Sequence, residues 1–103
     1  MTVELPQSIK NLKAVLDARH GEDIVILAPH DLADYFVIVT GRNRPHIEAL
    51  CDTAEESLLK DGHTRMHIEG LGSEWVLLDF GDIIVHVFNK EAREMYRLER
   101  LWS

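Results

Sequence analysis

The residues best suited to catalytic chemistry in this chain are two acidic side chains, Asp79 and Asp82. Nucleotidyltransferases hold two Mg²⁺ ions with carboxylates usually spaced Asp-x-Asp, because strand side chains alternate and this spacing points both to one face. Gly72-Ser73 would then be the upstream pair that contacts phosphate. The observed spacing is Asp-x-x-Asp across a tight turn, so the two carboxylates diverge, and a turn role for Asp82 is the simpler interpretation. We predict no enzyme and no cofactor, and keep a metal-dependent nucleotide-binding enzyme of this type as the alternative.

The six histidines raise the question of a metal site. His63 and His67 are four residues apart, but their segment is predicted to be a turn that enters a strand. Residues i and i+4 of a strand lie about 13 Å apart, which prevents joint chelation. The single cysteine, Cys51, falls on the predicted buried stripe of a helix. A structural zinc site is therefore not expected.

The compact basic cluster of the chain is formed by Arg42, Arg44 and His46, just before a predicted helix. Arginines beside a helix N-terminus bind anions readily, so this cluster could contact an RNA phosphate. The alternative is an ordinary solvated loop. The residues alone leave both interpretations open.

Size and composition indicate one globular domain spanning residues 1–103, with 46% hydrophobic and 28% charged residues. No apolar run approaches the roughly 18–20 residues that cross a bilayer, so no membrane association is expected. The first ten residues lack a basic segment followed by an apolar one, and a lone cysteine gives no intramolecular disulfide. We therefore expect a cytoplasmic location.

The formal net charge of −7 bears on the class of partner. Phosphate contacts dominate nucleic-acid affinity, and an acidic chain is repelled by them at long range. If the protein acts on a nucleic-acid assembly, we expect it to bind a protein component of that assembly.

The hydrophobic pattern predicts an α/β domain with five strands and three helices. The first two strands are apolar on both faces, which is typical of strands in the middle of a covered sheet. Helices on one face would leave the other sheet face partly bare. The predicted order is helix 6–18, strand 23–28, strand 35–41, helix 45–60 with Gly62 at its C′ position, strand 64–69, a hairpin over 74–88 and a short helix in 90–102.

Gly81-Asp82 is a two-residue turn signal inside the predicted hairpin. With this turn, one hairpin face is wholly apolar and is expected to be core. The second face pairs Asp79 with Ile84, Leu77 with His86, and Trp75 with Phe88. Such a mixture of aromatic, acidic and imidazole side chains is typical of neither core nor solvent-exposed surface.

The chain contains the segments DYFVIVTG at 34–41, EWVLLDFGDIIVHVF at 74–88 and YRLERLW at 96–102. Together these three segments resemble the ribosomal silencing factor family, also called the Iojap family. The resemblance implies a mixed sheet with helices, similar in topology to nucleotidyltransferases but without known catalysis. It also implies binding to the large ribosomal subunit through its fourteenth protein, which obstructs small-subunit joining, and homodimers when free. The chain departs from the family pattern in the short loop PHDLAD and at Arg42-Asn43-Arg44-Pro45, although His46 matches.

The resemblance places Trp75 on the exposed sheet surface that contacts the ribosomal protein. We predict Trp75, Leu77 and Phe88 as apolar anchors there, with Asp79 and His86 as orienting polar groups. The alternatives are that Trp75 closes the edge of the core and that His86 is a satisfied core histidine. Tyr96 and Trp102 match family positions and are interpreted as mainly structural, with a contribution to the binding edge. Leu98, Leu101 and Trp102 are expected to pack on the sheet or across a dimer.

Overall fold

The computed structural model describes residues 5–29 and 33–97, so the predictions for Leu98, Leu101 and Trp102 lie outside the described residues. A five-stranded mixed sheet with strand order β1-β2-β5-β4-β3 forms the centre. Strands β2 and β5 are parallel and the other pairs are antiparallel. The predicted fold class is confirmed, with the elements α1 (Gln7–Ala18), β1 (Glu22–Leu27), β2 (Tyr35–Gly41), α2 (Arg44–Lys60), β3 (His67–Glu69), β4 (Trp75–Asp79), β5 (Ile83–Asn89) and α3 (Lys90–Tyr96).

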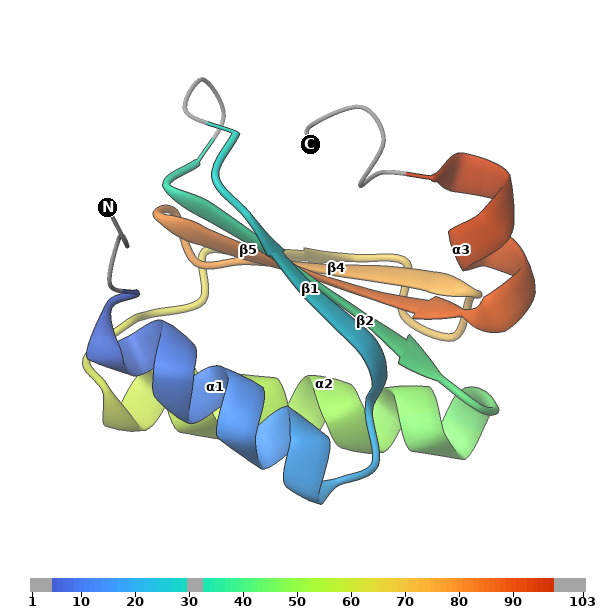
Figure 1. The fold of residues 1–103 in the computed structure, drawn as a ribbon, viewed down its shortest axis with the longest axis horizontal. Coiled ribbons are helices and arrows are strands. Elements are labelled where there is room, and N and C mark those ends of the chain that lie inside the picture. The colour runs from blue at the N-terminus through green and yellow to red at the C-terminus, as the bar shows by residue number, and fades with distance from the viewer. Residues whose placement is uncertain (1–4, 30–32, 98–103) are drawn as a thin grey trace.

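The helices divide unequally between the two faces of the sheet. Figure 1 shows α1 and α2 side by side on one face, while α3 lies at one end on the other. The main core lies under α1 and α2, and a smaller cluster on the opposite face joins Ala92 of α3 to Phe36, Ile38 and Phe88. Among residues 5–29 and 33–97, α3 is the helix that covers this second face, and it does so at one end, so the face is partly bare as the sequence predicts. No helix within the described ranges is long and apolar enough to cross a membrane.

The two long helices follow from their apolar spacing and their end residues. In α1, Ile9, Leu12 and Leu16 recur on one face and are fully buried. In α2, the Asn43 side chain accepts a hydrogen bond from the backbone N–H of His46, which caps the first turn. Gly62 follows the C-cap with φ 88°, a left-handed conformation that glycine adopts without strain. The predicted ends of both helices are correct to within one residue.

The prediction that both early strands lie in the middle of the sheet is half wrong. Strand β2 is central, and its residues from Phe36 onward are buried. Strand β1 is an edge strand with an irregular register between Glu22 and Val25, and none of its residues is fully buried. An apolar run shows that a strand is covered but not how many strands flank it, so β1 could not be placed from its composition.

The hairpin has the predicted register. Trp75 lies opposite Phe88, Leu77 opposite His86 and Asp79 opposite Ile84. The alternate side chains of both strands, from Val76 to Phe80 and from Ile83 to Val87, face the main core. The mixed second face is therefore turned away from α1 and α2, toward the side that carries α3.

Candidate partner-binding face

An aromatic group lies where α3 meets the open end of the hairpin. The Trp75 ring is 4.9 Å from the Phe88 ring and 4.7 Å from the Tyr96 ring, measured between centroids. Trp75 is partly exposed, Tyr96 is 45% exposed, and Met95 beside it is 76% exposed. We call the partly or fully exposed residues Trp75, Leu77 and Tyr96 the Trp75 face. The structure thus brings three of the predicted contact residues onto one accessible surface.

Phe88 and His86, which the sequence analysis predicts as an apolar anchor and an orienting polar group, are buried and do not reach this surface themselves. Phe88 is 1% exposed and His86 is 3% exposed. Phe88 lies beneath Trp75 and packs in the cluster that contains Ala92 of α3. Both residues support the Trp75 face from below.

His86 orients the tryptophan through a hydrogen bond. The indole Nε1–H of Trp75 donates to Nδ1 of His86 over 3.1 Å. Because indole N–H can only donate, the imidazole is the neutral tautomer with its proton on Nε2. That Nε2–H is buried and has no hydrogen-bond partner within the described residues. Burial lowers the pKa of His86 to about 4, so the ring is neutral at physiological pH.

The two aspartates of the hairpin do not converge. Asp79 Oδ1 accepts a hydrogen bond of 2.8 Å from the backbone N–H of Gly81. The turn role that the sequence suggested for Asp82 therefore belongs to Asp79, and the side chain of Asp82 is exposed. Among residues 5–29 and 33–97 no group of three or more His, Cys, Asp or Glu side chains is placed to hold a metal ion. His67, one of the two histidines considered for zinc, instead contacts Glu69 at 2.9 Å.

The three residues of the basic cluster have different roles in the structure: Arg42 and Arg44 line a hollow, whereas His46 holds the loop in place. Arg42 and Arg44 line a hollow of about 440 Å³ together with Asn43, Ile47, Ser73, Glu74 and Asn89. His46 Nδ1 accepts from the backbone N–H of Arg42 at 2.9 Å, and its Nε2 lies 2.8 Å from the carbonyl oxygen of Arg19. Both ring nitrogens are therefore used inside the protein, and the predicted anion contact by His46 is corrected to a structural role.

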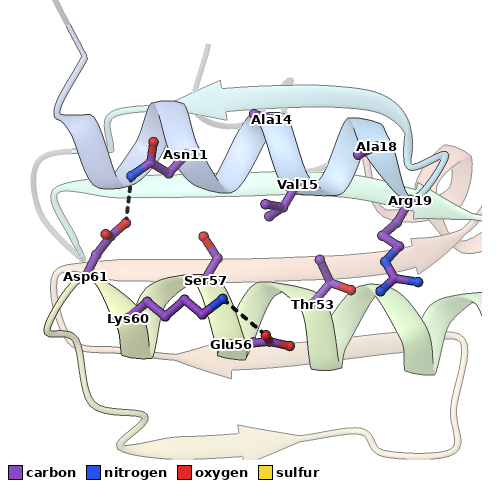
Figure 2. Close-up of a pocket in the computed structure, with 10 residues that line it drawn as sticks. All are labelled: Asn11, Ala14, Val15, Ala18, Arg19, Thr53, Glu56, Ser57, Lys60 and Asp61. Atoms are coloured by element: carbon purple, nitrogen blue, oxygen red, sulfur yellow. Dashed lines mark hydrogen bonds and ion pairs between the residues drawn. The ribbon is translucent and has the colours of Figure 1, made fainter.

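A second hollow lies on the opposite layer, between α1 and α2 (Figure 2). Its lining includes small side chains such as Ala14, Ala18 and Ser57. The Asn11 side chain closes one end by donating to Asp61 Oδ2 over 3.1 Å. Cys51 in α2 does not provide a nucleophile, because burial, with three neighbouring carboxylates, raises the pKa of its thiol to about 12.

Met95, which directly precedes Tyr96 of the Trp75 face, is an exposed apolar residue that the sequence analysis missed. The tail segment alternates charged and bulky residues, and its helix could be predicted, but its exposed side could not. Met95 is exposed because Ala92 and Arg93 take the buried side of α3, where an Arg93 N–H donates to the hydroxyl of Thr40 at 2.9 Å. The hydrophobic pattern of the sequence could not show that a charged residue, Arg93, lies on the buried side of α3.

The comparisons with known proteins decide the family. The family model described as "Ribosomal silencing factor during starvation" matches residues 2–103. The chain belongs to this ribosomal silencing factor family. The "Ribosomal silencing factor RsfS" of Bacillus subtilis is 35% identical over 99 residues, which cover 92% of this chain and 84% of the relative.

Solved structures and an organellar relative agree with this membership. A crystal structure of a Chromobacterium violaceum protein superposes with a TM-score of 0.88 at 30% identity, covering 97% of this chain and 87% of that one. The mouse protein named "Mitochondrial assembly of ribosomal large subunit protein 1" is 32% identical, and the match covers 92% of this chain but 45% of the mouse protein. The family predicted from the three sequence segments is confirmed.

Proposed function

We propose that this member of a ribosome-associated family is a translation repressor that binds the large ribosomal subunit through its fourteenth protein. Bound there, it sterically blocks the joining of the small subunit. The fourteenth protein as the target comes from the family resemblance, and the name of the mouse relative refers to the large subunit. The structure contributes a candidate surface, the Trp75 face.

The observation that carries the proposal is the exposure of aromatic side chains on a rigid support. Tyr96 is 45% exposed and its ring lies 4.7 Å from that of Trp75, which is hydrogen-bonded to His86 and stacked on Phe88; Met95, the preceding residue, is 76% exposed. Tryptophan and tyrosine dominate hot spots of protein interfaces, and a side chain already held in place loses little conformational freedom on binding. The net charge of −7 is consistent with docking on protein.

The mechanism requires no chemistry. An interface of standard size would bury on the order of 800 Å² per partner, and a domain 35 × 29 × 24 Å in extent would then occupy space that the small subunit must enter. Silencing follows mass action, since each 1.4 kcal/mol of lost affinity raises Kd about tenfold. We also propose that the protein works in the cytoplasm and is a homodimer when free, as the lone cysteine and the family resemblance respectively suggest.

The proposal is tested by co-sedimentation with isolated large subunits and by calorimetry with the purified fourteenth ribosomal protein. Trp75→Ala would disturb the buried His86 and Phe88 as well as the surface, so the exposed Tyr96→Ala is the sharper variant. Truncating a hot-spot side chain costs about 2 kcal/mol, so we expect its Kd to rise about 30-fold.

Leu59→Ala is the matched control, because Leu59 is also an exposed apolar residue, at 51%, but lies on α2 in the opposite layer. Its Kd should equal that of the wild type. If Tyr96→Ala binds as tightly as the wild type with an unchanged thermal midpoint, the Trp75 face is not the contact surface.

A further inference from the structure

The hollow beside Arg42 and Arg44 lies at the edge where the parallel strands β2 and β5 both end. Strand β2 ends at Gly41, just before Arg42, and β5 ends at Asn89, which lines the hollow. Ligands of α/β proteins typically bind outside the carboxyl ends of parallel strands, because the following turns and helices leave a crevice there. The position therefore suits a ligand, and the lining residues decide its chemistry.

Two arginines without protein partners set the charge of this hollow. Within the described residues, neither guanidinium makes a hydrogen bond or an ion pair, whereas Arg65 and Lys60 are each paired with a glutamate of α2. Two neighbouring arginines that are free of ion pairs present planar forks of N–H donors, whose geometry matches phosphate oxygens. These two arginines form a local positive group in a chain whose net charge is −7.

The loop that carries both arginines is fixed by internal hydrogen bonds. His46 holds the backbone of Arg42 to that of Arg19, and Asn43 caps the helix. The cap already uses the N–H of His46, and Pro45 has no N–H to donate. Anion binding at this hollow thus depends on the two guanidinium groups, and the helix N-terminus adds little to it.

The hollow adjoins the Trp75 face. Asn89 directly follows Phe88, and its backbone N–H donates to the carbonyl oxygen of Glu74, the residue before Trp75. A partner that covers the Trp75 face will therefore bring its own neighbouring surface against Arg42 and Arg44. On a ribosomal subunit, proteins are embedded in RNA, so that neighbouring surface carries phosphates.

We propose that Arg42 and Arg44 bind a ribosomal RNA phosphate next to the ribosomal protein that the Trp75 face binds. This inference rests on the proposed function. None of the lining residues is aromatic, so the hollow offers nothing on which the base of a free nucleotide could stack. The Glu74 carboxylate in the lining opposes the phosphate and keeps the RNA contact weak by itself. The arginines therefore add affinity only where protein and RNA are presented together.

The test compares the salt dependence of binding to isolated large subunits for the wild type and for the double variant Arg42→Ala/Arg44→Ala. Each phosphate contact contributes about 0.7–0.9 to the slope of log K against log salt concentration, so loss of this one contact should make the slope shallower by about that amount. Affinity at low salt should fall about tenfold or more. Binding to the purified fourteenth ribosomal protein should not change, and Glu74→Gln should bind the subunit more tightly than the wild type.

The control Lys13→Ala/Lys60→Ala removes the same charge from exposed sites on α1 and α2 and should behave as the wild type. If the arginine variant and this control have equal slopes and affinities, the inference is overturned while the protein contact stands. Binding of ATP or GTP that depends on the arginines, with no change at the subunit, would assign the hollow to free nucleotides and also overturn it. If the wild type fails to bind subunits at all, both the inference and the proposed function fall.

Discussion

Buried, neutral His86 should make the stability of the protein depend on pH in a defined window. Its pKa is about 4 in the folded chain against 6.5 when unfolded, because burial disfavours the charged imidazolium. The unfolded state therefore binds more protons between these two values, and the free energy of unfolding falls as the pH is lowered through the window. Relative to pH 7.5, the loss is about 2 kcal/mol at pH 5 and about 3 kcal/mol at pH 4.

The assay is urea unfolding followed by tryptophan fluorescence at several pH values between 7.5 and 4. Carboxylates also titrate here, so the contribution of His86 is the difference between the wild type and His86→Gln, whose side chain does not ionise. We expect the curve of the variant to be flatter by the amounts above. NMR titration of the imidazole C–H signals gives a second readout on the wild type. A His86 midpoint near 6.5 in the folded protein would refute the assignment of a buried, neutral ring.

Three further predictions concern the support of the Trp75 face and the core. Trp75→Phe keeps the ring stack on Phe88 but leaves both nitrogens of His86 unpaired, so urea unfolding should show a loss of about 1–3 kcal/mol; an unchanged midpoint would mean that the indole bond does not matter. Gly70→Ala should lower the thermal midpoint more than Gly72→Ala, because both glycines have φ near +80° but only at Gly70 would the added methyl meet the carbonyl of Trp75; equal effects would contradict this packing. Cys51 should resist iodoacetamide at pH 8 in the folded protein and react in urea, since its thiol is buried with a pKa of about 12; rapid labelling of folded protein would place it at the surface.

Local chemistry determined the elements that the sequence predicted well. The Gly81-Asp82 turn, with φ 84° at Gly81, fixed the register of the hairpin, and that register separated the core face from the mixed face. Similarly, Pro45 and Gly62 marked the predicted ends of α2, within one residue of its observed bounds. In each case the residues that carry the signal are close together in the chain.

The errors arose where contacts between distant segments decide the outcome. The mixed face is typical of neither core nor surface by its composition, and its own strands could not reveal that α3 folds back over Phe88. His86 was ambiguous because its acceptor role depends on the orientation of Trp75 on the neighbouring strand. His46 looked like part of a basic patch, yet it bonds to Arg19, which lies 27 residues earlier in the chain. The edge position of β1 likewise depends on the strand order of the whole sheet.

The most direct test of the account is light scattering that follows the joining of purified small and large subunits. Large subunits are first incubated with the wild type, with Tyr96→Ala or with Leu59→Ala. We predict that the wild type and Leu59→Ala reduce joining in proportion to the large subunits they occupy, and that Tyr96→Ala fails to do so at the same concentration. Undiminished joining on large subunits that demonstrably carry the wild-type protein would contradict the steric mechanism.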